Sequence, residues 1–136
     1  MITVRNVSKS FGTQRVLHRI NLEIEPGKTT AVVGPSGVGK SVLLKLIMGI
    51  LQPDEGEIFV CGENMTQART EAEKNQIRAK LGVLFQSAAL LDSLTVFENI
   101  AFPLRERFKM PRREMHNKVW YMIEALSLED LAWHYP

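Results

Sequence analysis

The sequence predicts an α/β fold in which an antiparallel β subdomain adjoins an incomplete parallel sheet with helices. Residues 2–7 and 16–24 alternate apolar and polar side chains, which is typical of half-buried strands. Residues 28–33 form a short apolar run, and a glycine-rich turn connects them to residues 42–48, which are apolar on nearly every side. A strand that leads through a tight turn into a buried helix is the repeating unit of α/β sheets.

The turn between this strand and helix fits a phosphate-binding pattern, in which Gly and any four residues precede Gly, Lys and then Ser or Thr. Its residues are Gly34, Pro35, Ser36, Gly37, Val38, Gly39, Lys40 and Ser41. Glycines let successive N–H groups curl around phosphate, and the helix N-terminus adds its positive dipole end. Lys40 would reach the β- and γ-phosphates and Ser41 would bind Mg²⁺. The alternative, a turn that merely links strand to helix, is disfavoured by this context.

Composition describes a soluble globular domain or part of a larger one. The 136 residues are 45% hydrophobic and 24% charged, with a net charge of +2, which is too even to indicate nucleic acid. No apolar run approaches the roughly 18 residues of a membrane span, and the first residues are no signal peptide, so we expect a cytoplasmic protein. Cys61 lies in an apolar run and is expected to be buried. The histidines show no metal-ligand spacing.

Phe11 is the one aromatic residue in the polar turn between the first two strands. An aromatic ring at such a turn is poorly placed for burial unless something stacks on it, and an adenine ring would fit. From position alone, Phe11 covering the sheet edge is an equally good interpretation.

The middle of the chain continues the alternation of strands and helices. Gly49 and the turn at 52–56 end the first helix, and a strand follows at 57–62. Residues 66–80 are charged and predict a helix that faces solvent. The apolar run that begins at Leu81 is a strand that ends in Gln86.

The chain after Gln86 is unusually apolar for a loop. Ala88 to Leu94 show no clear helical period, and a helix then begins, capped by Asp92 or Thr95 with Glu98 placed for a capping box. Such a loop is either a lid on the core or a partner surface.

Two further segments complete the chain. The basic run 105–113 could contact nucleic acid or anionic lipid, but a solvated connection between helices is favoured. Pro111 can start the last helix, whose apolar positions predict core packing: Met115, Val119, Met122, Ile123 and Leu126.

One element of a phosphate-loop hydrolase is missing, namely an acidic residue at the end of a second hydrophobic strand. The sequence also ends after an amphipathic helix, without a closing strand. We therefore expect residues 1–136 to be the N-terminal part of one larger domain, with a nucleotide-binding core at about 1–86 and the start of a helical subdomain at about 87–136.

The order of these motifs resembles the ATP-binding subunit of ATP-binding-cassette (ABC) transporters along the whole chain. The order is an aromatic turn, the phosphate loop, a strand ending in Gln86, and an apolar loop with the run 94–100. The stretches 34–45, 84–90 and 101–106 look like the lipid-transport branch, which serves the maintenance-of-lipid-asymmetry and mammalian-cell-entry (MCE) systems.

The resemblance implies a role for each site residue. Phe11 would stack on the adenine of ATP, and Val16 would flank the same ring. Residues 34–41 would bind the phosphates, with Val42 beside them in place of the family's common Thr. Gln86 would contact Mg²⁺ and the attacking water. The family's signature segment, its Mg²⁺-binding Asp, its catalytic Glu and its switch His match nothing in these 136 residues.

The resemblance also implies partners and a location. The loop after Gln86 would meet a membrane permease, a second copy of the subunit would complete the ATP site, and an MCE-domain protein would belong to the system. The complete protein would be an ATPase driving lipid transport at the inner face of the cell membrane. The 136-residue piece alone would not sustain hydrolysis, and an apolar sheet edge would stay bare.

Two other hypotheses remain. A phosphate-loop kinase or GTPase is disfavoured, because the guanine-reading Asn-Lys-x-Asp pattern is absent and the aromatic turn is unusual there. A soluble ABC protein of translation or DNA repair should carry a basic rather than an apolar loop after Gln86.

Overall fold

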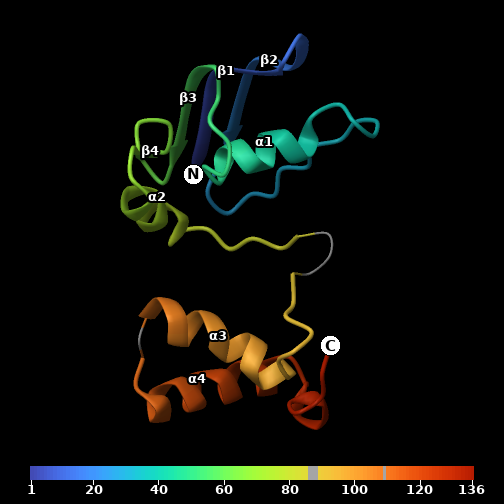
Figure 1. The fold of residues 1–136 in the computed structure, drawn as a ribbon, viewed down its shortest axis with the longest axis vertical. Coiled ribbons are helices and arrows are strands. Elements are labelled where there is room, and N and C mark those ends of the chain that lie inside the picture. The colour runs from blue at the N-terminus through green and yellow to red at the C-terminus, as the bar shows by residue number, and fades with distance from the viewer. Residues whose placement is uncertain (86–88, 109) are drawn as a thin grey trace. The chain divides into compact units, whose positions relative to one another are not determined.

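The computed structural model of the protein describes residues 1–85, 89–108 and 110–136, and only the backbone of Arg107 (Figure 1). The chain forms two compact units, Met1–Val83 and Leu84–Pro136. In the described part of the chain, no helix has the length and apolar composition needed to cross a membrane.

The first unit is built on a four-stranded antiparallel sheet. Its strands are β1 (Ile2–Phe11), β2 (Gln14–Ile24), β3 (Glu55–Val60) and β4 (Glu63–Asn64), in the order β2-β1-β3-β4 (Figure 1). Two-residue turns close both hairpins, and such turns favour positive φ. In the β3–β4 turn, Cys61 has a φ of 48° and Gly62 a φ of 84°. Cys61 is therefore exposed in a turn, and its predicted burial in a strand is wrong.

A bulge in β1 brings β1 and β3 unusually close together. The β1–β3 register shifts between Arg5 and Ser8, and Asn6 within this bulge has a φ of 50°. Gly56 at the start of β3 has a φ of 87°, and a Cβ there would collide with the carbonyl oxygens of Arg5 and Asn6. Only glycine fits at this position, so the bulge and Gly56 fix where β3 begins.

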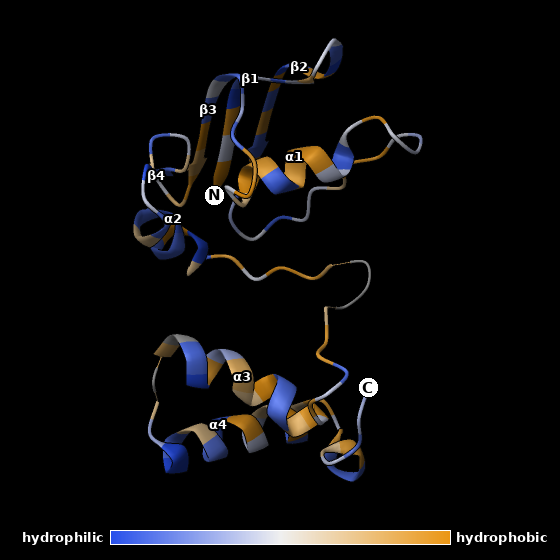
Figure 2. Ribbon diagram, in the orientation of Figure 1, coloured by the Kyte–Doolittle hydropathy of each residue, from blue (hydrophilic) through white to orange (hydrophobic). Residues whose placement is uncertain are grey.

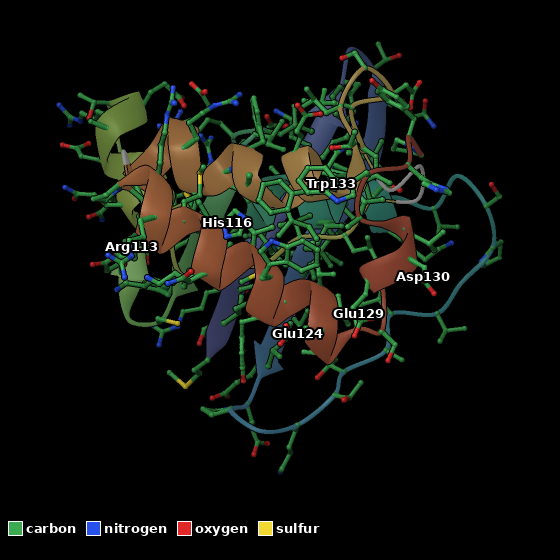
Figure 3. The ribbon with its side chains drawn as sticks, turned by 90° about the horizontal axis from the view of Figure 1, so that it is seen from below. Arg113, His116, Glu124, Glu129, Asp130 and Trp133 are labelled. Atoms are coloured by element: carbon green, nitrogen blue, oxygen red, sulfur yellow. The ribbon has the colours of Figure 1, made fainter. Side chains whose placement is uncertain are left out.

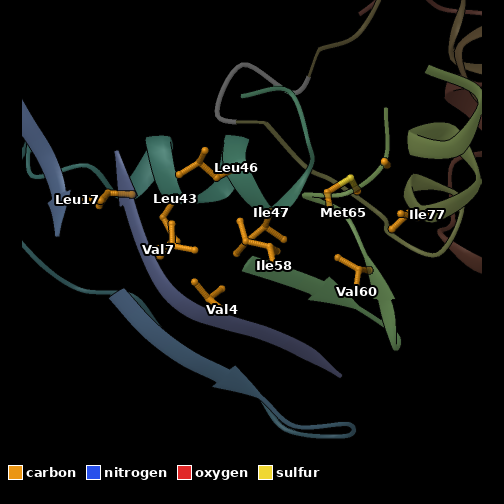
Figure 4. Packing of buried hydrophobic residues seen from close by; sticks show 11 residues of the cluster. Val4, Val7, Leu17, Leu43, Leu46, Ile47, Ile58, Val60, Met65 and Ile77 are labelled. Carbon is orange, nitrogen blue, oxygen red and sulfur yellow. The ribbon is translucent and has the colours of Figure 1, made fainter. Parts of the chain in front are cut away.

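Helix α1 (Lys40–Ile47) covers one face of the sheet. Leu43, Leu46 and Ile47 pack on side chains from β1 and β3, which are Val4, Val7, Ile58 and Val60 (Figure 4). This confirms a helix after the glycine loop. The expectation that the helix is buried all round is wrong, because Leu44 is 44% exposed. An apolar stripe suffices to bury one face of a helix against a sheet.

Helix α2 (Glu71–Arg78) ties the end of α1 to the rest of the unit. Thr70 and Glu73 form a capping box at its start. At its end, the Arg78 guanidinium donates to the carbonyl oxygens of Met48 (2.8 Å) and Gly49 (3.0 Å), just beyond α1. The segment predicted to face only solvent thus also serves the core, and it buries Ile77 as well.

Two predicted strands of the parallel sheet are not strands in the structure. Residues 28–33 and 82–85 have no ladder partner, and the sheet formed by the described residues is wholly antiparallel. Their apolar side chains are exposed instead, with Val33 at 90% and Leu84 at 82%. Figure 2 shows the segment after α2 as a hydrophobic stretch. The α/β class is confirmed, but its predicted parallel part does not form, because a strand needs a neighbour for its backbone hydrogen bonds.

The second unit is a helical hairpin of α3 (Val96–Phe108) and α4 (Arg112–Ala125), followed by the short 3₁₀ helix η1 (Glu129–Leu131). Thr95 begins α3 with the expected capping box: its N–H and hydroxyl donate to Glu98, whose N–H donates to the Thr95 hydroxyl. The core consists of Phe97, Ala101, Val119, Ile123 and Ala132.

An aromatic cluster closes the open end of this hairpin. The rings of Phe97 and Trp133 stack at 4.9 Å, and Trp120 Nε1 donates to His116 Nε2 at 3.0 Å. In Figure 3, Arg113 lies toward one end of α4, whereas Glu124, Glu129 and Asp130 lie toward the other. In the predicted core stripe of α4, Val119 and Ile123 are buried, but Met122 and Leu126 are exposed, so the predicted stripe is too wide.

Candidate functional site

The glycine loop joins residues 28–33 directly to the N-terminus of α1. Gly37 (φ 82°) and Gly39 (φ 102°) adopt left-handed backbone conformations that side chains disfavour. Gly39 is the N-cap of α1, and among the described residues no side chain caps the helix and no acidic residue lies in its first turn. The first N–H groups and the positive end of the helix dipole are thus left for an external acceptor, which favours an anion.

The glycine loop is in close contact with β2 at Gly39. A Cβ at this position would lie 2.8 Å from Val16 Cγ1 and 2.9 Å from Leu17 Cδ2, closer than van der Waals contact permits. Val16 is half-buried and thereby supports the end of the loop from behind. Its predicted contact with a base is untested and stays a prediction.

Lys40 closes the loop on itself. Its Nζ donates to the carbonyl oxygens of Gly34 at 2.7 Å and Pro35 at 2.6 Å. The loop therefore curls around an ammonium group that is held by neutral acceptors. A phosphate oxygen would offer the same ammonium a charged acceptor and a stronger, charge-assisted hydrogen bond.

The other loop residues are accessible. Gly34, Pro35, Ser36, Gly37 and Val38 are exposed, as is Ser41 in the first turn of α1, whereas Val42 is half-buried. The Ser41 hydroxyl makes no hydrogen bond within the described part of the chain. A free hydroxyl in this position suits a hard cation such as Mg²⁺, which takes few protein oxygens and completes its shell with water and phosphate oxygens.

A hollow of about 380 Å³ lies between β2, residues 30–33 and α1. Its walls are mainly aliphatic, with Leu17 and Leu43 among them, and they also include Val38, Gly39 and Lys40 of the glycine loop. A phosphate chain needs N–H donors and cations rather than such walls. The hollow thus adjoins the glycine loop, but its mainly aliphatic walls offer little to a phosphate chain beyond the loop itself.

Phe11 ends β1 and is 46% exposed, so its ring is available for stacking. Lys9 Nζ lies over the ring, 5.6 Å from its centroid, and is paired with Asp54 Oδ1 at 2.7 Å. Sequence reasoning did not identify Lys9 or Asp54. The sequence indicates only a turn at Asp54, and no motif connects two residues so far apart in the chain.

Gln86, predicted to contact Mg²⁺ and water, lies outside the described residues. The described part of the chain contains no group of three or more His, Cys, Asp or Glu that could hold a metal ion.

Comparisons with known proteins all indicate the same family. The family model described as "ABC transporter" matches residues 17–135. The Escherichia coli (strain K12) "Intermembrane phospholipid transport system ATP-binding protein MlaF" is 39% identical over 132 residues, which are 97% of this chain and 49% of that protein. The Mesostigma viride "Sulfate/thiosulfate import ATP-binding protein CysA" is 38% identical over 135 residues, or 99% of this chain and 37% of that protein.

The fold has solved counterparts as well. The post-hydrolysis dimeric structure of the ATP-binding cassette MJ0796 bound to ADP and Pi matches all of this chain and 62% of its own, with a TM-score of 0.84 and 31% identity. The chain thus spans about half the length, or less, of these curated relatives. The names of these two relatives specify different substrates, although their identities to this chain are nearly equal, so identity alone does not indicate a substrate.

Proposed function

Because the chain belongs to the ABC transporter family, we propose that the complete protein binds and hydrolyses ATP to drive transport, with phospholipid or another lipid as cargo. The observation that carries the proposal is the glycine loop curled around Lys40 at the uncapped N-terminus of α1. We assign residues 1–86 to the nucleotide-binding core and 87–136 to the start of the helical subdomain.

In this proposal the loop residues 34–41 donate N–H groups to the triphosphate, and Lys40 exchanges its two carbonyl partners for β- and γ-phosphate oxygens. Val42 lies beside the phosphates. Ser41, together with Gln86, would hold Mg²⁺, which supplies positive charge to the transferring phosphoryl group. Gln86 also orients the attacking water. These roles therefore belong to residues of the glycine loop, to Val42 directly after it and to Gln86.

The base would stack on Phe11 with Val16 at its edge. The exposed ring of Phe11 supports this assignment, since an aromatic face in contact with solvent gains from a flat apolar partner. The kinase and GTPase alternatives share the phosphate loop, but the match of residues 17–135 to the ABC transporter family model disfavours them. The exposed Leu90 and Leu91 disfavour a soluble ABC protein, which should carry a basic loop there.

For partners, we propose a membrane permease, a second copy of this subunit and an MCE-domain protein, with no role for nucleic acid. Leu90 and Leu91 in the loop after Gln86 are 51% and 42% exposed, which supports a protein-docking role for this loop. The dimeric form named for MJ0796 supports the second copy. Docking on a permease would keep the protein on the inner face of the cell membrane.

The lipid cargo is supported by the similarity to MlaF, a phospholipid transport protein by name, and the similarity to the sulfate/thiosulfate import protein CysA gives the competing possibility. Reconstitution with the permease in vesicles would separate them: ATP-dependent movement of a labelled phospholipid is expected, and sulfate uptake without lipid movement would contradict the lipid assignment. Charged substitutions at Leu90 and Leu91 are expected to abolish co-purification of the permease.

Titration of ATP into the complete protein tests the nucleotide site itself. Lys40→Ala should weaken ATP binding by about 10- to 100-fold, the value of a charge-assisted hydrogen bond, and abolish turnover. Lys45→Ala is the matched control, because Lys45 is an exposed lysine in the last turn of the same helix. Equal ATP affinity in the Lys40→Ala and wild-type proteins would reject the proposed site.

A further inference from the structure

We propose that Lys9 and Asp54 are positioning residues that hold the Phe11 ring in place for the adenine base. The inference rests on the proposed function and refines the part of the site that selects the base. Neither residue needs to touch the nucleotide, since both act through Phe11.

The first observation is the position of the Lys9 side chain. Its ammonium lies over the Phe11 ring, 5.6 Å from the centroid, within the range of a cation–π interaction. The Lys9 side chain is only 16% exposed, which is low for a lysine, and its charge is paired with Asp54 at 2.7 Å. Lys9 is therefore a fixed part of the turn that ends β1.

The second observation is that Asp54 forms hydrogen bonds with each of the three consecutive residues that precede Phe11. Its Oδ2 accepts the N–H of Ser10 at 2.7 Å, its Oδ1 accepts from Lys9, and its own N–H donates to the carbonyl oxygen of Ser8 at 2.9 Å. These hydrogen bonds lower the pKa of Asp54 below its ordinary value of 3.8, the Lys9 bond first and the Ser10 bond second. The carboxylate is thus ionised wherever the protein functions near neutral pH.

The third observation is that Asp54 itself is anchored. It directly precedes β3, whose start is fixed by Gly56 under the β1 bulge. Because β3 cannot shift along β1 without losing this close approach, Asp54 is held at a constant position relative to the end of β1. The turn that follows α1 therefore supports the aromatic residue of the base site.

The consequence is that Lys9 lies over one face of the Phe11 ring, while the residue as a whole is still 46% exposed. A free aromatic side chain loses rotational freedom when a base stacks on it, and a ring already held in place loses less. Immobilising one side chain corresponds to about a twofold to tenfold change in affinity, so Lys9 should contribute within that range.

The experiment measures the affinity of the intact polypeptide for ATP and for inorganic tripolyphosphate, which has no base. Lys9→Met keeps the length of the side chain and removes its charge. It should weaken ATP binding about twofold to tenfold and leave tripolyphosphate binding unchanged. The control is Lys80→Met, which removes an exposed lysine that is paired with Glu63 at 3.1 Å. This control should change neither affinity.

A double-mutant comparison with Phe11→Ala shows whether Lys9 acts through the ring. The effect of Lys9→Met on ATP should disappear when Phe11 is already alanine, and Lys9→Arg should retain most of the wild-type affinity. Asp54→Asn should reproduce the selective loss for ATP, and it serves as the second variant if Lys9→Met proves unstable in thermal unfolding.

Two outcomes would overturn the inference while the proposed function stands: equal weakening of ATP and tripolyphosphate by Lys9→Met, or a full Lys9→Met effect in the Phe11→Ala background. The second would mean that Lys9 contacts the nucleotide directly. If the wild-type protein bound neither ligand and Lys40→Ala changed nothing, the proposed function would fail, and the inference with it.

Discussion

The glycine loop offers a test in which two glycines of one motif should respond differently to the same methyl group. Both Gly37 and Gly39 have positive φ, so alanine is strained at either position. At Gly37, the added Cβ would have no atom within 4 Å. At Gly39, it would lie 2.8 Å from Val16 Cγ1, 2.9 Å from Leu17 Cδ2 and 3.3 Å from the carbonyl oxygen of Val16.

The expected free energies follow from these contacts. A left-handed conformation costs a residue with a Cβ about 1–2 kcal/mol, and this applies to Gly37→Ala and Gly39→Ala alike. Overpacking adds about 1–3 kcal/mol only at Gly39, since β2 must shift to admit the methyl group. The unfolding free energy should therefore fall by about 1–2 kcal/mol in Gly37→Ala and by about 2–5 kcal/mol in Gly39→Ala.

Urea denaturation of the two variants and the wild type measures the difference, with ATP titration in parallel. Gly39→Ala should be the less stable variant by more than the uncertainty of the extrapolation. If the two variants lost equal stability, the loop would not be pressed against β2 as described. If Gly37→Ala were the less stable one, the argument from contact distances would be refuted.

Three further substitutions or conditions test the supporting structure. Arg78→Leu should lower the unfolding free energy by about 1–3 kcal/mol, because two carbonyls beyond α1 lose a charged donor, and Arg78→Lys should recover only part of this in urea denaturation. Thr95→Ala should destabilise the helical hairpin by about 1 kcal/mol, measured by the thermal midpoint, since the capping box with Glu98 is lost. Acidification should act through Asp54: because folding depresses its pKa below 3.8, its stabilising contribution is present above that pH and lost as the pH falls through the folded pKa, and the loss should be smaller in Asp54→Asn.

The features predictable from sequence were those specified by short-range chemistry. The glycine loop was identified because its positive-φ positions and the following helix N-terminus lie within eight consecutive residues. The capping box of Thr95 and Glu98 was identified for the same reason. The first two strands were identified by alternation, because an antiparallel hairpin needs only a tight turn to pair its own strands.

The features that could not be predicted from the sequence depend on contacts between residues far apart in the chain. Cys61 was assigned to a strand by its apolar neighbours, but Gly62 makes it the first residue of a turn. Lys9 and Asp54 form an ion pair although they are 45 positions apart in the chain. Their pairing depends on how β3 lies against the β1 bulge, which no sequence periodicity indicates. The sequence likewise indicates only a turn at Gly56, whereas in the structure Gly56 permits the close approach of β3 to β1.

The same distinction explains the two apolar runs that are not strands. Residues 28–33 and 82–85 have the composition of buried parallel strands, yet composition cannot supply a neighbour. A parallel strand is joined to its neighbour only through a long crossover connection, so its pairing depends on other elements, unlike that of a hairpin strand. Val33 and Leu84 are therefore almost fully exposed in a chain whose hairpins are complete. Their exposure does not weaken the case for the phosphate site, because the loop geometry is set by Gly39 against β2 and by Lys40, and neither depends on a parallel partner.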